Sequence, residues 1–266
     1  MRNKLFTMKT ILTFLVISAS IFSCKKAEEQ KNNNLIFEKT EVKKSDIKIT
    51  PISHATAVLE FGETVIYIDP TGGAKAFEGF KTPNYIFITD IHGDHMNKKT
   101  LNELDLANTT IVTPDAAVKQ LQAINAKEII IINNGESKTI NNFSVEAIPM
   151  YNLREEALKF HSKGRGNGYV FNIDNERIYF SGDTEDIPEM RNLNNIDKAF
   201  VCMNLPYTMT VESAASAVLE FKPKQVYPYH YKGTNGLSDV SKFKKLINNG
   251  NNEIEVVQLN WYPNRK

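Results

Sequence analysis

Cysteine is scarce in this sequence: two residues in 266 cannot form the disulfide framework of a small secreted fold. The apolar stretch at residues 11–22 is too short to span a bilayer as a stable helix. Charge of one sign is lacking as well, because the formal net charge is +1, and no basic stripe or RNA-type aromatic motif occurs. We therefore expect no nucleic-acid partner. No Gly-x-Ser-x-Gly elbow is present, which removes one common hydrolase centre.

The N-terminal segment has the pattern of a targeting signal. Three basic residues precede the apolar residues 11–22, and Ser23-Cys24 follow directly after them. A small residue followed by cysteine after a short apolar run resembles a bacterial lipoprotein signal, in which the cysteine is lipidated. We predict a signal peptide over residues 1–23, a lipidated Cys24 with a polar tether over 24–46, and a folded domain over 47–266. The protein would then be anchored to a membrane of the bacterial cell envelope. A conventional secretory signal or a retained anchor is the alternative, and Met8 is an alternative start.

The remaining sequence alternates between strand and helix patterns. Its 41% hydrophobic content is enough for one large core. We predict strands at 47–52, 56–61, 64–69, 85–88, 110–112, 127–132, 137–150, 169–173, 177–181 and 254–259, and helices at 97–105, 115–123, 211–221 and 238–247. This order predicts an α/β, four-layer αβ/βα sandwich, in which two mixed β-sheets pack face to face and helices cover their outer surfaces. Cys202 lies in a further strand-like stretch, and we predict it to be a small buried residue without a disulfide partner.

The segment Thr-Asp-Ile-His-Gly-Asp-His at residues 89–95 carries the most chemistry. Four potential metal ligands, Asp90, His92, Asp94 and His95, follow directly after the buried strand 85–88. Ligands at the C-terminal end of a strand lie where α/β sheets usually place their sites. Imidazole combined with carboxylate suits zinc, iron or manganese. A tight turn cannot direct all four side chains at one ion, so the segment predicts two neighbouring metals rather than a solvated polar turn.

The other histidines also stand beside predicted strands. His54 precedes the strand 56–61, and His230 follows the strand-like residues 225–229. Asp183 follows the strand 177–181 in a Ser-Gly-Asp-Thr sequence. One histidine beside a strand is usually structural, but repeated placement of this kind gathers such side chains along one sheet edge.

The order of these motifs resembles the metallo-β-lactamase-fold metallo-hydrolase superfamily, in the branch of ascorbate-6-phosphate lactonases and N-acyl phosphatidylethanolamine phospholipase D. That branch has an early His-Ala-Thr, matched at residues 54–56, and an Asp-Pro closing the next strand, matched at 69–70. It continues with a His-x-His-x-Asp-His turn, matched at 90–95 in all but its first position, a Gly-Asp-Thr, matched at 182–184, and a late Pro-x-His, matched at 228–230. The resemblance covers about residues 47–260.

The resemblance implies that His92 belongs to a first metal, that Asp94, His95 and His230 belong to a second, and that Asp183 bridges the two. Two positions depart from the family pattern. Asp90 replaces a histidine, and Tyr151-Asn152 stand where the next histidine would follow the strand 143–150. The next available imidazole is His161. We therefore expect a first site of Asp90, His92 and His161, with Asn152 as an outer or substitute ligand; a solvated His161 is the alternative.

These residues predict two divalent transition metals, zinc in the first place and manganese or iron as alternatives. An anionic oxygen binds zinc at about 2.0–2.2 Å, so Asp90 can replace imidazole. It is a harder ligand, which favours manganese or iron somewhat. Asp90, Asp94 and Asp183 would face two divalent cations, leaving a net positive centre.

The predicted function is a metal-dependent hydrolase that uses a metal-bound hydroxide on an ester, lactone or phosphodiester. Asp94 or Asp183 would move the proton, and His54 is a substrate-facing or structural candidate. Arg154, Lys163 and Arg165 in the loop of His161 favour an anionic small-molecule substrate, although a solvated loop explains them equally. The alternatives are a metal-binding protein of the same fold without hydrolytic turnover and a di-iron oxidoreductase.

Overall fold

The computed structural model describes residues 46–263. The predicted signal peptide, the lipidated Cys24 and nearly all of the tether lie outside the described residues. Within residues 46–263, no helix is both long and apolar enough to cross a membrane.

The first sheet has the order β1-β2-β3-β4-β5-β6, with two antiparallel pairs followed by parallel ones. Side chains alternate between its two buried faces: Leu59 and Ile66 face the second sheet, whereas Val58 and Tyr67 belong to a separate cluster on the outer face. Burial on both faces explains why these strands are almost continuously apolar. The strands are β1 (Lys48–Ser53), β2 (Thr56–Phe61), β3 (Thr64–Ile68), β4 (Tyr85–Phe87), β5 (Thr110–Thr113) and β6 (Glu128–Ile131).

The second sheet has the order β15-β12-β11-β10-β9-β8-β7. Its antiparallel part comes first along the chain, and β10, β11, β12 and β15 are parallel. The strands are β7 (Ser137–Ile140), β8 (Phe143–Met150), β9 (Gly166–Ile173), β10 (Glu176–Phe180), β11 (Lys198–Cys202), β12 (Gln225–Tyr229) and β15 (Glu255–Val256). A small hairpin, β13 (Lys232–Gly233) and β14 (Gly236–Leu237), follows β12.

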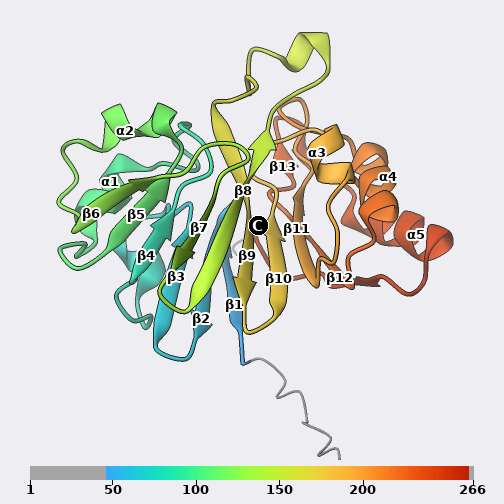
Figure 1. The fold of residues 1–266 in the computed structure, drawn as a ribbon. Helices are drawn as coiled ribbons and strands as arrows, with labels where there is room; N and C mark the ends of the chain where they lie inside the picture. Colours follow the sequence, from blue (N-terminus) through green and yellow to red (C-terminus); the bar gives the residue numbers. More distant parts are fainter. Residues whose placement is uncertain (1–45, 264–266) are drawn as a thin grey trace, which may run out of the picture. The chain divides into compact units, whose positions relative to one another are not determined.

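Helices cover the outer faces of both sheets, so the predicted four-layer α/β sandwich is confirmed (Figure 1). The first sheet carries α1 (Lys98–Glu103) and α2 (Asp115–Leu121), and the second carries α3 (Pro188–Arg191), α4 (Val211–Phe221) and α5 (Val240–Gly250). Two short 3-10 helices, η1 (Ala74–Phe77) and η2 (Glu155–Ala157), lie in loops. Thr210 caps α4, because its hydroxyl accepts a hydrogen bond from Ser213 N.

Two predicted elements differ in length from the observed ones. The last strand was expected over 254–259 but pairs only at residues 255–256 of β15. Val226 O accepts a hydrogen bond from Val257 N, so residue 228 is the next one facing β15, and Pro228 has no N–H to extend the ladder. Conversely, β9 begins at Gly166 instead of residue 169, because it pairs with β8 as far as Met150 opposite Gly166. Asn167 N also donates to Thr89 O, which ties this strand to the turn at residues 89–95.

Candidate metal centre

The turn after β4 divides its four polar side chains into two groups. The backbone N–H groups of His95 and Met96 both donate to His92 O, at 3.0 and 2.8 Å. This helical turn directs Asp94 and His95 toward one group of ligand atoms, while Asp90 and His92 face another. The predicted division of one short segment between two neighbouring clusters is therefore what the geometry shows.

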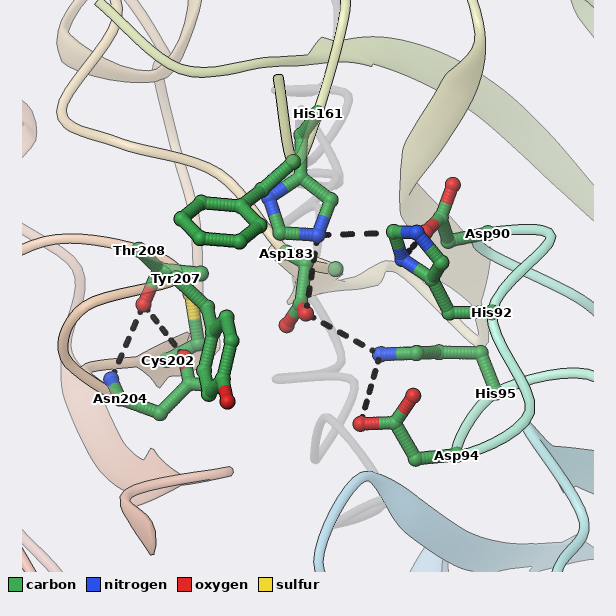
Figure 2. A network of polar contacts seen from close by, with 12 residues as sticks. Asp90, His92, Asp94, His95, His161, Asp183, Cys202, Asn204, Tyr207 and Thr208 are labelled. Carbon is green, nitrogen blue, oxygen red and sulfur yellow. Dashed lines mark hydrogen bonds and ion pairs between the residues drawn. The ribbon is translucent and has the colours of Figure 1, made fainter. Parts of the chain in front are cut away.

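Asp94, His95, Asp183 and His230 form one cluster, with ligand atoms within 4.8 Å of one another. These are the ligands predicted for the second metal, and the group is called the first cluster from here on. His95 Nε2 lies 3.3 Å from Asp183 Oδ2, and His230 Nε2 lies 3.1 Å from Asp183 Oδ1. Figure 2 shows the Asp183 carboxylate between the rings of His95 and His161. Asp183 Oδ1 is buried and, beyond this contact with His230 Nε2, has no hydrogen-bond partner. Because buried polar atoms normally have a partner, this oxygen fits a place for a cation.

A buried carboxylate fixes the orientation of His95. Asp69 Oδ2 lies 2.7 Å from His95 Nδ1, and the same carboxylate accepts hydrogen bonds from Thr89 N and Thr89 Oγ1 at 2.8 and 2.6 Å. With Nδ1–H donating to Asp69, the Nε2 lone pair faces the cluster. Hydrogen bonds of this kind set the tautomer and basicity of metal-binding histidines. The sequence marks Asp69 only as the end of a strand.

Asp69→Asn is expected to weaken metal binding by about 10–100-fold while the fold stays intact, because an amide cannot stabilise the ligand histidine as a carboxylate does. A competition titration of zinc against a chromophoric chelator measures this change. Asp115→Asn, on the exposed surface of α2, is the control and should bind zinc like the wild type. Equal affinity in both variants would remove Asp69 from the metal centre.

Asp90, His92 and His161 form the second cluster. His92 Nδ1 lies 2.6 Å from Asp90 Oδ2, whereas His161 Nε2 lies 3.9 Å from the same oxygen and 3.3 Å from Asp183 Oδ2. His161 is buried, so it is not a solvated loop residue. The structure brings the seven proposed ligands together in two neighbouring clusters, and their role as ligands stays a prediction.

Asn152 orients His161 rather than facing the cluster itself. Its amide nitrogen donates to Ala157 O and Tyr207 O, at 2.9 and 2.7 Å. Its Oδ1 is therefore the atom that faces His161 Nδ1, at 3.2 Å. The ring then donates from Nδ1 and presents Nε2 to Asp183.

His54 lies at the edge of the first cluster. Its Nε2 is 3.4 Å from Asp94 Oδ2, and its Nδ1 is 2.8 Å from the hydroxyl of Tyr262. The ring also contacts that of His230, with centroids 3.8 Å apart. His54 thus connects the most exposed carboxylate of the cluster to a tyrosine near the end of the described chain.

Opposite charges within the two clusters shift the pKa values of their carboxyl and imidazole groups. Burial alone would raise the pKa of Asp183, but the neighbouring imidazoles of His230 and His95 hold it well below its usual range. Burial lowers the pKa of His95, yet the carboxylates of Asp183 and Asp69 outweigh this effect and keep it well above its usual value. Burial likewise opposes ionisation of Asp90, but His92, His95 and Arg165 lower its pKa to about 2. Since a histidine must lose its proton to bind a metal, binding is expected to strengthen as pH rises.

Two cavities open beside these residues. A cavity of about 320 Å³ is lined by His92, Asp94, Phe160, His161, Asp183, Asn204 and Tyr207. A second cavity of about 430 Å³ is lined by Ser53, His54, Tyr207, Lys232, Gly233, Thr234 and Tyr262. Tyr207 lines both, and its ring packs edge-on against Phe160 with centroids 5.1 Å apart. Tyr207 is therefore placed to contact a ligand in either cavity.

The three cationic side chains of the His161 loop have internal partners. Arg154 Nε lies 2.7 Å from Glu185 Oε1, and Lys163 Nζ lies 2.9 Å from Glu189 Oε1. Arg165 pairs with Asp90. Arg165 is largely buried in its ion pair, whereas Lys163 is exposed and agrees with the interpretation of a solvated loop. None of the three lines either of the two cavities described above, and Lys232 is a cation in the wall of the second cavity.

Strained backbone accompanies the site. His54, Asp69 and His230 have left-handed conformations, with φ of 58°, 43° and 45°. Non-glycine residues rarely adopt this region, and such outliers persist where surrounding structure holds them. All three end a strand and carry a side chain that belongs to the centre or supports it.

Residues 48–230 match the model of the beta-lactamase superfamily domain, which is more than half of the chain. The chain belongs to this superfamily. The predicted membership of the metallo-β-lactamase-fold metallo-hydrolases is thereby confirmed. A UPF0173 metal-dependent hydrolase of Pyrococcus horikoshii is 30% identical over 223 residues, covering 80% of this chain and 96% of the relative.

Solved structures agree with this fold. A protein of Parabacteroides distasonis, described as a candidate metal-dependent hydrolase, is 34% identical, with a TM-score of 0.71 over 80% of this chain and 92% of its own. CmlA, a diiron beta-hydroxylase of Streptomyces venezuelae, is 15% identical, with a TM-score of 0.61 over 81% of this chain and 53% of its own. At that identity the likeness to CmlA shows the shared fold alone.

Proposed function

We propose that this member of the superfamily is a metal-dependent hydrolase of an ester, lactone or phosphodiester bond in a small molecule. The observation that carries the proposal is the convergence of Asp94, His95, Asp183 and His230 from three separate loops onto one point beside a cavity. Two imidazoles and two carboxylates suit zinc, with manganese and iron as alternatives. When bound there, such an ion supplies a Lewis acid that activates water and polarises the substrate oxygen.

The residues around this point have different roles in the proposed reaction. His95, His230 and Asp183 are buried and held in place, so they provide the fixed part of the site. Asp94 is the exposed member and contacts His54, so the Asp94–His54 pair is placed to accept a proton and release it to solvent, while the Tyr262 hydroxyl holds the His54 ring in position. Phe160 and Tyr207 form an aromatic wall suited to an apolar part of the substrate. Lys232 in the adjoining cavity suits an anionic part.

A hydrolysis screen with the purified protein tests the function. The protein, prepared without chelator and supplied with zinc or manganese, is offered nitrophenyl esters, lactones and bis-nitrophenyl phosphate. Activity with at least one class is expected, and His230→Ala should abolish it together with metal binding. A wild-type protein that holds no stoichiometric metal under these conditions would overturn the proposal.

Removing the metal is expected to destabilise the protein. A ligand present at about 1,000 times its dissociation constant stabilises the native state by about 4 kcal/mol. For a domain of this size that corresponds to a Tm about 8–16 °C lower after treatment with a chelator. Thermal unfolding followed by circular dichroism measures the shift, and readdition of zinc should reverse it. His230→Ala serves as the control, because its Tm should not respond to the chelator.

A further inference from the structure

The second cluster contains a cation of the chain's own. Arg165 Nε donates to Asp90 Oδ1 and Arg165 Nη2 donates to Asp90 Oδ2, both at 3.1 Å. Arg165 precedes β9, which runs antiparallel to β10, so it reaches the same sheet edge as the other site residues. The Asp90 side chain is completely buried, and that of Arg165 is 18% exposed. A two-pronged pair of this kind is the strongest ion-pair geometry available to arginine.

This pair leaves Asp90 poorly suited to a metal ion. An outer hydrogen-bond donor normally takes the carboxylate oxygen that the metal does not use. Here the guanidinium covers both oxygens, and Oδ2 also contacts His92 Nδ1 at 2.6 Å. His161 Nε2 lies closer to Asp183 than to Asp90. A divalent ion at this position would stand directly beside a permanent positive charge.

The charges of the whole centre lead to the same result. Three carboxylates, Asp90, Asp94 and Asp183, face the site. Arg165 neutralises Asp90, which leaves Asp94 and Asp183 to balance one divalent cation. The first cluster has no comparable cation: its buried histidines are neutral when they bind a metal. The two clusters are therefore unequal although both have ligand-type side chains.

We propose that the centre holds one metal ion, at Asp94, His95, Asp183 and His230, and that Arg165 takes the place of the second. This inference rests on the proposed function. His92 and His161 line the 320 Å³ cavity. Without a metal bound to them, their imidazoles can contact the substrate. Asp90 fixes the ring of His92, and Asn152 fixes that of His161.

Metal counting on the full-length protein tests the inference. The apoprotein is reconstituted with excess zinc, desalted, and analysed for zinc per chain by mass spectrometry. One zinc per chain is expected for the wild type and for His161→Ala. His230→Ala should weaken zinc binding by more than about 100-fold. Arg165→Met, which keeps the length but removes the charge, should raise the count from one to two.

Arg154→Met is the matched control for Arg165→Met. Arg154 belongs to the same loop and also pairs with a buried carboxylate, that of Glu185, so loop disturbance alone is present in both variants. Its zinc count should stay at one. If Arg165→Met does not fold, Asp90→Asn replaces it, and the zinc count should again remain at one.

Two zinc ions in the wild type, with one lost in His161→Ala or Asp90→Asn, would overturn the single-metal centre and leave the hydrolase proposal standing. An unchanged count in a folded Arg165→Met would show that the arginine does not exclude the second ion. Absence of any zinc or manganese from the wild type would instead contradict the proposed function itself.

Discussion

Asp183→Asn is expected to reduce kcat/KM on the order of 10³-fold, the scale on which loss of a preorganised charged group at a reacting centre acts. The substitution keeps the shape of the side chain but removes a buried negative charge that contacts His95, His161 and His230. Because these imidazoles lose their common partner, metal affinity should fall together with turnover. Steady-state kinetics on the substrate found by screening and a zinc competition titration measure the two effects.

Asp186→Asn is the matched control for this experiment. Asp186 lies three residues further along the same loop, but its carboxylate pairs with Arg191 at 2.5 Å and has no contact with the clusters. Near wild-type kinetics are expected. Full activity in Asp183→Asn would remove the metal centre from catalysis.

Gly182→Ala is expected to destabilise the protein by about 3 kcal/mol, which corresponds to a Tm lower by about 6–12 °C. Gly182 has φ of +60°, and a Cβ added there would lie 2.5 Å from Met150 Sδ and 3.0 Å from Asn167 O. The methyl group would therefore meet both backbone strain and a packed neighbour, directly beside Asp183. Thermal unfolding of the metal-free protein isolates the effect on the fold.

Gly62→Ala is the control that separates backbone strain from contact with packed neighbours. Gly62 has a similar φ of +52°, but a Cβ there would meet no heavy atom within 4 Å. Only the conformational part, about 1 kcal/mol, should be lost in this variant. If both variants have the same Tm, the close packing around Gly182 contributes nothing measurable.

Sequence patterns were sufficient for the layers and for the positions of the ligand-type side chains. Runs of apolar residues determine the strands, and the carboxyl ends of parallel strands gather at one edge of a sheet, so Asp183 and His230 were expected close together. The structure brings these two residues together with Asp94 and His95 from the facing sheet. Cys202 is buried as predicted, and its burial raises the pKa of the thiol to about 12.

The supporting contacts were not predictable in the same way. Arg165 and Asp90 are 75 residues apart, and the choice of partner depends on how β9 is placed beside the turn. The partners of Arg154 and Lys163 were not predictable either, since the sequence around a charged loop residue indicates neither its ion-pair partner nor its burial. The short α3 and the β13–β14 hairpin were also missed, because elements of two to four residues carry too few positions for a periodic pattern.

The left-handed backbone at His54, Asp69 and His230 has a consequence for how this chain tolerates change. Each position combines a conformation that glycine or asparagine adopts more easily with a side chain that the centre requires. Replacement of His230 by glycine would relieve this strain but would also remove the stabilisation of about 4 kcal/mol that a bound metal supplies. Selection for thermal resistance in metal-free medium would therefore accept replacements that selection with the metal present rejects, so a search for a robust catalyst must supply the metal and select for turnover at the same time.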